Sequence, residues 1–194
     1  MAAVLGFAAD HHRGPAVPDI LRGQLVRLRA FEEEDMPTYL GWLNDHEVQR
    51  FHGTRYPRNM DDLDGRVSVA PMRYSSAGFA VEALDDGSLI GEVTLEALHP
   101  EMRSALLGIT IGDRSRWGRG YGTDTVRTVC RFGFDMMNLH RVELHVFHEN
   151  AAAIRAYEKA GFKREGLLRE AVYKHGHWMD DVVMGLLQDE LRWE

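Results

Sequence analysis

Short stretches in which polar and apolar residues alternate mark the first half of the chain. The alternation is clear over residues 24–29, which predicts a half-buried β-strand. Strands are also predicted over residues 78–83, 89–95 and about 104–111. The Asp86-Gly87 pair between the second and third of these stretches is a strong hairpin signal. Three strands that follow one another so closely predict an antiparallel meander.

After the meander, the spacing of the apolar residues becomes helical. Residues on one face of this predicted helix recur three or four positions apart: Val126, Val129, Cys130, Gly133, Phe134 and Met137. Polar residues fall on the opposite face: Asp124, Arg127, Arg131 and Asp135. This amphipathic pattern predicts a helix packed on the sheet.

The third part of the chain returns to strands. Residues 142–147 alternate again, and because this strand is reached through a right-handed helical crossover, it should lie parallel to the strand of 104–111. Asn150 is placed to cap the following helix, and Gly161 can supply its left-handed end. The last two strands are expected at about 165–173 and 181–187.

The N-terminal part shows less regular patterns. Residues 1–20 have no periodicity and are expected to form a flexible arm, which leaves residues 21–194 as a single domain. Asp35 is expected to cap a helix, and a poorly defined helical stretch is expected around residues 60–69. The order of elements predicts an α/β (α+β) fold with one mixed, mostly antiparallel central sheet and flanking helices.

Composition narrows the class of protein. The chain has 194 residues, 44% hydrophobic and 27% charged, as is ordinary for a globular domain. Its formal net charge of −7 does not suggest nucleic-acid binding and would favour cationic substrates such as amines. No apolar run is long enough for a membrane span, and the N-terminus does not resemble a signal peptide, so a cytoplasmic protein is expected. The one cysteine, Cys130, is expected to be a packed thiol.

The stretch Trp117-Gly118-Arg119-Gly120-Tyr121-Gly122-Thr123 stands between a predicted strand and a predicted helix. Glycine allows positive φ and a close approach to backbone N–H groups, and a helix N-terminus adds unpaired donors and a positive dipole end. The stretch therefore predicts an anion cradle, with a purely structural turn as the alternative. It is neither a dinucleotide-binding loop, because Thr123 replaces the third glycine, nor a P-loop, because it contains no lysine.

These motifs resemble the GCN5-related N-acetyltransferase (GNAT) superfamily. The resemblance covers about Gln24 to the C-terminus and is carried by residues 107–113, 117–123 and 150–162. Within the superfamily, the chain is most similar to the branch of ribosomal-protein-alanine and spermidine acetyltransferases. The family loop is matched at Gly120 and Gly122, while Trp117 occupies its first position.

The resemblance implies acetyl-CoA as the acetyl-donor co-substrate, without a metal. It implies that the loop amides hold the diphosphate, that Asn150 contacts the cofactor, and that Ile109, Thr110 and Ile111 pair with the pantetheine arm. A backbone N–H of that strand would polarise the thioester carbonyl. The strand would be splayed from its parallel neighbour at the cofactor site, and a bulge near Gly108 or Gly112 is expected to help.

Tyr157 is the candidate general acid. It lies seven positions after Asn150, as the tyrosine does in the spermidine acetyltransferases that the chain resembles. A phenol, with its pKa of about 10, could protonate the departing thiolate of the cofactor. The alternative is that Tyr157 fills the core between helix and sheet.

The general base is left open between several residues. Glu92 and His145 are polar residues at strand positions, and His148 and Glu149 are further candidates. Arg119 is the best placed of the basic residues to neutralise the cofactor phosphates. The histidine pairs are not accompanied by a convincing set of metal ligands, so no metal site is predicted.

The resemblance therefore implies an acetyl-CoA-dependent N-acetyltransferase that acts on a primary amine by direct transfer. The alternative is an acyl-CoA-binding module with little or no catalysis. The acceptor is left open between a protein N-terminus, a polyamine and another small amine. No nucleic-acid or membrane partner is expected, and association into a homodimer is left open.

Overall fold

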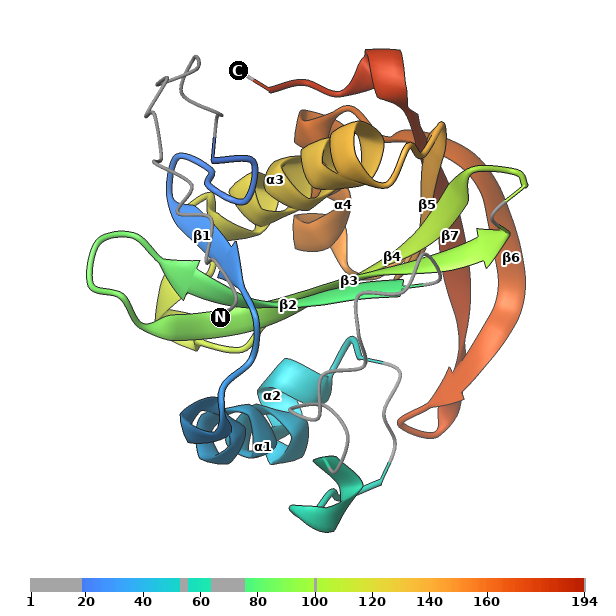
Figure 1. Ribbon diagram of the computed structural model, residues 1–194. Helices are drawn as coiled ribbons and strands as arrows, with labels where there is room; N and C mark the ends of the chain where they lie inside the picture. Colours follow the sequence, from blue (N-terminus) through green and yellow to red (C-terminus); the bar gives the residue numbers. More distant parts are fainter. Residues whose placement is uncertain (1–18, 53–55, 64–75, 100, 194) are drawn as a thin grey trace, which may run out of the picture.

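One twisted sheet forms the centre of the molecule in the computed structural model, which describes residues 19–52, 56–63, 76–99 and 101–193 (Figure 1). Its strands are β1 Val26–Arg29, β2 Ser76–Ala83, β3 Leu89–His99, β4 Ser104–Ile111, β5 Arg141–Phe147, β6 Lys163–Lys174 and β7 His177–Leu187. Their spatial order is β1-β2-β3-β4-β5-β7-β6. Neighbouring strands are antiparallel except β4 and β5, which are parallel.

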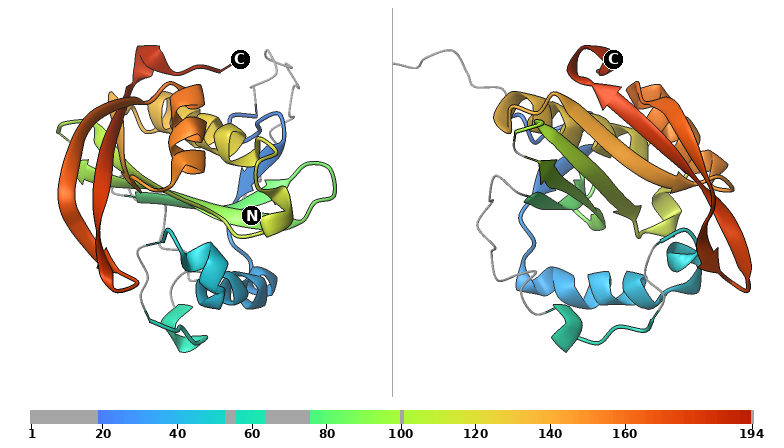
Figure 2. Two further views of the ribbon diagram at one scale, coloured as in Figure 1. Left: turned by 180° about the vertical axis from the view of Figure 1, so that it is seen from behind. Right: turned by 90° about the vertical axis from the view of Figure 1, so that its right-hand side faces the viewer.

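Helices cover both faces of this sheet. They are α1 Met36–Asn44, α2 His46–Gln49, α3 Tyr121–Met136 and α4 Ala151–Ala160, with short 3-10 turns at Glu33–Asp35, Asp61–Leu63, Arg114–Arg116 and Gln188–Glu190. Helices α3 and α4 lie on one face, and α1 and α2 lie on the other (Figures 1 and 2). We call these the α3–α4 face and the α1–α2 face.

The main core lies between the sheet and α3 with α4. Val126, Val129 and Cys130 of α3 are fully buried there against strand residues such as Val93 and Leu144. A smaller apolar cluster joins α1 to the turn Asp61–Leu63: Met36, Tyr39, Leu43 and Leu63. The apolar period predicted for α3 is therefore its packing face.

Most predicted elements are present with similar bounds. Strand β4 begins and ends where the alternation predicted, and its parallel pairing with β5 is confirmed. The Asp-Gly hairpin joins β2 to β3 with Gly87 at φ +73°, and α4 ends at Gly161 with φ +116°. Positive φ is costly for any residue with a Cβ, which explains the glycines at these two positions.

Strands β6 and β7 extend beyond their predicted ranges. They meet in a tight turn at His175 and Gly176, which both have positive φ. The short helix α2 was not predicted; Asp45 caps it by accepting hydrogen bonds from the N–H groups of Glu47 and Val48. Of the helical stretch expected around 60–69, only residues 60–63 are described, and 61–63 form a 3-10 turn.

One sequence-based expectation was wrong in detail. Asp35 occupies the N-cap position of α1, but its carboxylate accepts from Arg29 and from the N–H of Glu32 instead of capping the helix. Asp124, on the polar face of α3, is buried. The β3–β4 register runs without a shift from the Gly91–Ile111 pair to the Ala97–Ala105 pair, so no bulge lies at Gly108. At Gly112, the N–H groups of Gly112 and Asp113 both donate to the Ile90 carbonyl, at 2.8 and 3.1 Å, which is the hydrogen-bond pattern of a bulge.

The flexible arm expected over residues 1–20 lies mostly outside the described residues, which begin at residue 19. The first described residues are anchored: Arg131 of α3 donates hydrogen bonds to the carbonyls of Asp19, Ile20 and Arg22, and Ile20 packs against the main core. Cys130 is fully buried, as expected of a packed thiol, and its burial raises the pKa of the thiol.

Candidate functional site

Strands β4 and β5 separate in the middle of the sheet. Their parallel register contains the pairs Ser104–Arg141, Ala105–Val142 and Leu106–Glu143, and it ends there. Residues 107–111 of β4 and 144–147 of β5 therefore leave a gap between two strands that would otherwise be neighbours. A sheet interrupted in this way exposes backbone hydrogen-bonding groups in its interior.

Alternate residues of β4 point their backbone N–H and C=O groups to opposite sides, which determines the groups that face this gap. The N–H of Gly112 donates to the Ile90 carbonyl of β3, so the N–H and C=O of Ile109 and Ile111 point the opposite way, toward β5. The Ile111 carbonyl accepts a hydrogen bond of 2.7 Å from Trp117 Nε1. Ile109 is left as the backbone unit at the open edge, whereas the backbone of Thr110 faces β3.

The loop before α3 carries a run of unpaired backbone donors. The N–H of Trp117 donates to the Arg114 carbonyl at 3.2 Å, and the N–H of Asp124 donates to the Gly120 carbonyl at 3.0 Å. Between them, the N–H groups of residues 118–123 have no hydrogen-bond acceptor among the described residues. Gly118 and Gly120 have φ of +71° and +94°, so the loop turns at the two positions where a Cβ would be strained.

The side chains of the loop point in different directions. Trp117 is 44% exposed and reaches back to the end of β4. Arg119 contacts the Ser115 carbonyl at 3.4 Å and remains exposed. Tyr121 is buried, and its hydroxyl donates to Asp85 at 3.0 Å, so this residue can offer a ligand only its backbone. Gly122 and Thr123, half-buried, begin the helix.

Arg116 is a buried residue of the site that the sequence reasoning missed. Its guanidinium donates to Asp85 at 2.6 Å and to the Tyr121 hydroxyl at 2.8 Å, and it is also paired with Asp86. These contacts tie the loop to the β2–β3 hairpin, and the hydrogen bond from Arg116 lowers the pKa of Asp85. The Asp85-Asp86 pair had been interpreted only as a turn signal, although two carboxylates side by side also indicate a basic partner.

Asp124 explains how an acidic residue can lie in the first turn of α3 next to an anion site. Its carboxylate accepts from the N–H groups of Gln24, Leu25 and Val26 at 3.1, 2.7 and 3.0 Å. Gly23 is required beside it, because a Cβ there would lie 2.4 Å from the carboxylate. The charge of Asp124 is thus used to fix β1 against α3, and the loop amides remain free.

Tyr157 lies on the α3–α4 face, in the main core. It is 9% exposed, its ring centroid lies 6.0 Å from that of Phe162, and its hydroxyl has no partner in the described part of the chain. Burial raises the pKa of the phenol to about 12. Asn150 caps α4 as predicted, since its side-chain oxygen accepts from the N–H of Ala153 at 3.1 Å.

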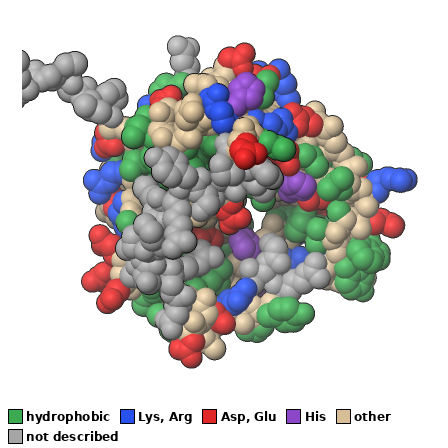
Figure 3. Space-filling view, turned by 45° about the vertical axis from the view of Figure 1, so that its right-hand side comes forward, with side chains coloured by type: hydrophobic (Ala, Val, Ile, Leu, Met, Phe, Trp, Pro, Cys, Tyr) green, Lys and Arg blue, Asp and Glu red, His purple; other side chains and the backbone are tan. Residues whose placement is uncertain are grey.

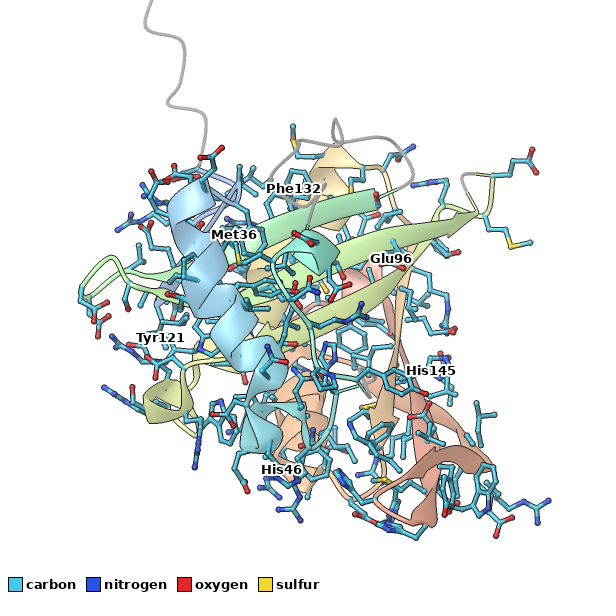
Figure 4. The ribbon with its side chains drawn as sticks, turned by 90° about the horizontal axis from the view of Figure 1, so that it is seen from below. Met36, His46, Glu96, Tyr121, Phe132 and His145 are labelled. Carbon is cyan, nitrogen blue, oxygen red and sulfur yellow. The ribbon has the colours of Figure 1, made fainter. Side chains whose placement is uncertain are left out.

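The candidate bases lie on the opposite, α1–α2 face. Glu92 of β3 is buried and accepts a hydrogen bond of 2.8 Å from the Tyr39 hydroxyl of α1. His145 of β5 has 38% of its side chain exposed, and its Nδ1 lies 3.0 Å from Asp181 of β7. Seen from this face, Glu96 and His145 lie on the part of the sheet beside α1 (Figure 4). His148 and Glu149 are exposed at the end of β5.

The molecule is hollowed next to these strands. The space-filling view from the β6–β7 side shows an opening with acidic and histidine side chains at its edge (Figure 3). A cavity of about 460 Å³ lies between the α1–α2 region and the β6–β7 turn, and the residues that line it include Leu43, His46, Gln49, Tyr56, Tyr173 and Lys174. The described residues contain no group of three or more side chains suited to bind a metal ion.

The structure thus brings the loop, the open edge of β4 and the N-terminus of α3 together in one place. It separates Tyr157 from Glu92 and His145 by the thickness of the sheet, and the two sides can meet only through the gap between β4 and β5. Among the helices that the structure describes, none combines the length and hydrophobicity that a membrane span requires.

Comparison with known proteins finds similar sequences and structures. Residues 26–163 match the family of acetyltransferase (GNAT) domains. The chain is 28% identical over 165 residues to the spermidine N(1)-acetyltransferase of Vibrio cholerae. This alignment covers 85% of this chain and 94% of that protein. It is also 34% identical over 113 residues to a probable N-acetyltransferase, YjcK of Bacillus subtilis. This alignment covers 58% of this chain and 62% of YjcK.

Solved structures have a similar overall fold. The crystal structure of spermidine N-acetyltransferase from Vibrio cholerae in complex with CoA and spermine superposes with a TM-score of 0.77 at 28% identity, covering 86% of this chain and 97% of that one. An acetyltransferase of the GNAT family from Bacillus anthracis superposes with a TM-score of 0.75 at 20% identity, over 88% and 99% of the chains, and supports the fold alone.

Proposed function

The chain belongs to the acetyltransferase (GNAT) family and is an acetyl-CoA-dependent N-acetyltransferase. From this premise, we propose that residues 118–123 hold the diphosphate of acetyl-CoA, that Tyr157 protonates the departing thiolate, and that the acceptor is a cationic primary amine which enters from the α1–α2 face. The observation that carries the proposal is the run of unpaired N–H groups beside the gap between β4 and β5.

The loop fits a diphosphate in charge and in shape. Six successive backbone donors are free of partners among the described residues, and they coincide with the positive end of the α3 dipole. A Cβ at Gly118 would meet no atom within 4 Å, and one at Gly122 would meet only Ile111 at 3.8 Å. The space above these two glycines is therefore open to a ligand, which supports the cradle over a purely structural turn.

The edge of β4 fits the arm that connects a diphosphate to a thioester. Ile109 presents its N–H and C=O to the gap, as a residue on an unpaired strand edge does. In the proposed complex, the pantetheine arm extends along this edge and a fixed N–H group stabilises the negative charge that develops on the thioester oxygen. Thr110 contributes through its side chain on the α1–α2 face, since its backbone is used by β3.

Tyr157 is proposed as the general acid because it carries a neutral hydroxyl group, on the cofactor side of the sheet, that has no hydrogen-bond partner among the described residues. Its raised pKa keeps the phenol protonated at any working pH. Asn150 is proposed to contact the cofactor through its amide group while its oxygen caps α4. Core packing against Phe162 also holds the ring, and the two roles are compatible.

The acceptor is proposed to be a cation because carboxylates gather on the α1–α2 face near the gap. The register of the sheet places the side chains of Glu92, Glu96, Glu143 and Asp181 on this face. Such a surface attracts an ammonium group and disfavours an acidic substrate. Proteins similar to this chain carry the names of spermidine acetyltransferases, so a polyamine is the first acceptor to test.

The experiment combines calorimetry of acetyl-CoA binding with measurement of thiol release. The panel of acceptors contains spermidine, free amino acids and a peptide with a free N-terminus. We expect binding of acetyl-CoA and release of the thiol with at least one polyamine. Release only with the peptide would replace the polyamine by a protein N-terminus.

The runner-up is an acyl-CoA-binding module with little or no catalysis. Binding of acetyl-CoA without thiol release on any amine would favour it. The hydroxyl of Tyr157, which no described residue binds, supports the enzyme, because a binding module has no need of a proton donor there.

We also propose that two copies of the chain associate through the edge of the sheet. Strand β6 is the last strand of the sheet and is exposed along most of its length. Large apolar side chains that are about half exposed lie on β6 and β7: Leu167, Leu168, Tyr173 and Trp178. Light scattering after size exclusion should show a dimer, and Leu168→Lys should shift it toward the monomer.

A further inference from the structure

We infer that His145, oriented by Asp181, is the group that removes the proton from the acceptor amine. The inference rests on the proposed function, because it assigns a residue to the same reaction. It concerns a pair of side chains that the sheet brings together from positions 36 residues apart in the chain.

The pair is defined by the register between β5 and β7. His145 lies opposite Val183, and Asp181 lies opposite Phe147, so the two side chains are diagonal neighbours on the α1–α2 face. Nδ1 of His145 lies 3.0 Å from Oδ2 of Asp181. Because a carboxylate only accepts hydrogen bonds, Nδ1 carries the hydrogen in the neutral ring, and Nε2 keeps the lone pair that a base needs.

The surroundings of Asp181 suit a residue that orients His145. It is 8% exposed, and its other oxygen, Oδ1, is buried without a hydrogen-bond partner among the described residues. An unpaired carboxylate oxygen in a buried position is costly, and a positive charge on the neighbouring ring reduces that cost. Asp181 therefore stabilises the imidazolium that forms when His145 accepts a proton.

Glu143 completes the site on the other side of the ring. Its Oε1 lies 3.5 Å from Nε2 of His145, which is longer than a normal hydrogen bond, so one donor lying beside the two atoms could contact both. Its Oε2 accepts from Arg141 at 2.8 Å, so the carboxylate is held in place. An ammonium group bound between Glu143 and His145 would contact the base directly.

The position of the pair relative to the gap supports this role. Continuing the parallel register past the Leu106–Glu143 pair places His145 at the level of Gly108, across the widening gap. Gly108 has no side chain on this face, and a Cβ there would lie 2.7 Å from Thr94 Oγ1. The approach from His145 to the open edge of β4 is thus not filled by a side chain of residue 108.

Glu92, the other carboxyl candidate, is less suited to this task. Its carboxylate is buried and already accepts a hydrogen bond from Tyr39. His145, in contrast, keeps 38% of its side chain exposed and can pass its proton to solvent. We therefore assign Glu92 to positioning α1 on the sheet.

The proton balance of the reaction is then complete. His145 takes one proton from the ammonium group, and the free nitrogen forms a bond to the acetyl carbon. The carbon–sulfur bond breaks, and the sulfur takes the proton of Tyr157. The second proton of the former amine returns to the Tyr157 oxygen, and His145 releases its proton to water, so that one proton leaves for each amide formed.

The test compares His145→Gln and Asp181→Asn with the full-length wild type on a series of primary amines of decreasing basicity. The described charged groups that face the ring are Glu143 on its own strand and Asp181 on β7, and both are retained in His145→Gln. For a strongly basic amine, His145→Gln should lower kcat/KM by about 10²-fold and Asp181→Asn by about 10-fold. His140→Gln, at an exposed position before β5, is the matched control.

The dependence on amine basicity separates a base from a structural residue. A weakly basic amine arrives deprotonated, so the defect of His145→Gln should shrink to a few-fold with such an acceptor while acetyl-CoA affinity stays unchanged. A constant defect across the series, or a wild-type rate in His145→Gln, overturns the assignment and leaves the acetyltransferase intact. Absence of transfer by the wild type on every amine overturns the proposed acceptor class as well.

Discussion

Single residues of the site combine a structural contact with a proposed chemical role. Asn150 caps α4 and is proposed to bind the cofactor, and Tyr157 packs on Phe162 and is proposed to donate a proton. In each case, the structural contact fixes the rotamer, which is the condition for a chemical role. Substitutions at this scale should therefore be chosen to remove one atom and leave the packing.

Tyr157→Phe removes only the hydroxyl group. We expect kcat to fall by about 10²-fold with the affinity for acetyl-CoA unchanged, because the ring still packs in the core. Steady-state kinetics and calorimetry measure the two quantities. An unchanged kcat would assign the proton to another group or to water.

The raised pKa of Tyr157 also predicts how kcat depends on pH. Burial disfavours the phenolate, so the neutral acid persists until the pH approaches about 12. Ionisation of this phenol should therefore not lower kcat between about pH 8 and pH 10, where an ordinary phenol begins to ionise. A decline in wild-type kcat in that range that is absent from Tyr157→Phe would contradict this expectation.

Gly122→Val tests the cradle. The new Cβ would contact only Ile111 at an ordinary distance of 3.8 Å, so the fold should tolerate it, while the methyl groups would occupy the approach to the loop amides. We expect the dissociation constant for acetyl-CoA to rise by at least about 10-fold. Gly120→Val is less informative, because φ at this position is +94° and any Cβ is strained.

The control for this variant is Gly41→Val in α1, where a Cβ would meet no atom within 4 Å. It should leave acetyl-CoA binding unchanged in the same titration. Wild-type affinity in Gly122→Val would show that the segment 117–123 only turns the chain.

At the scale of elements, the site depends on how α3 is fixed to β1. Asp124 supplies this connection through three backbone N–H groups, and Arg116 connects the same loop to the β2–β3 hairpin. These two contacts hold the N-terminus of α3 beside the end of β4. The direction of the loop amides is therefore set by elements far from it in the chain.

Asp124→Ala should lower the free energy of unfolding by about 3 kcal/mol, because it leaves three N–H groups at the start of β1 without their acceptor. Urea denaturation measures the change. Asp135→Ala, at an exposed position of the same helix, serves as the control and should change stability by less than about 0.5 kcal/mol. A loss below about 1 kcal/mol in Asp124→Ala would mean that water replaces the carboxylate.

At the scale of the whole molecule, we expect charge to direct cationic substrates. The formal net charge is −7, and acidic side chains gather on the α1–α2 face. A polycation should be drawn to this face over distances that depend on ionic strength, since the screening length falls from about 30 Å at 0.01 M salt to about 10 Å at 0.1 M.

Raising the salt concentration over this range should therefore lower kcat/KM for spermidine several-fold, and much less for a singly charged amine of similar size. Initial rates at saturating acetyl-CoA give the comparison. Equal salt dependence for the two acceptors would remove long-range steering as a cause of substrate preference.

The sequence determined most elements of this protein and the place of its proposed cofactor loop. Strand alternation, the helical period of α3, the cap at Asn150 and the glycines at 87, 120 and 161 depend on the residue and its near neighbours. Such local signals can be recognised in the sequence without knowledge of the fold. The family resemblance added the chemistry, because its motifs are also continuous in the chain.

Only the tertiary structure decided how distant residues meet. The early end of the β4–β5 register, the burial of Asp124 under β1, the Arg116 anchor and the His145–Asp181 pair all join segments from 30 to 100 residues apart or strands that are not consecutive. A sequence pattern reports which face a side chain occupies, but it does not report what lies on the neighbouring strand. The site is formed where strands separate, and that separation is a property of the packed sheet.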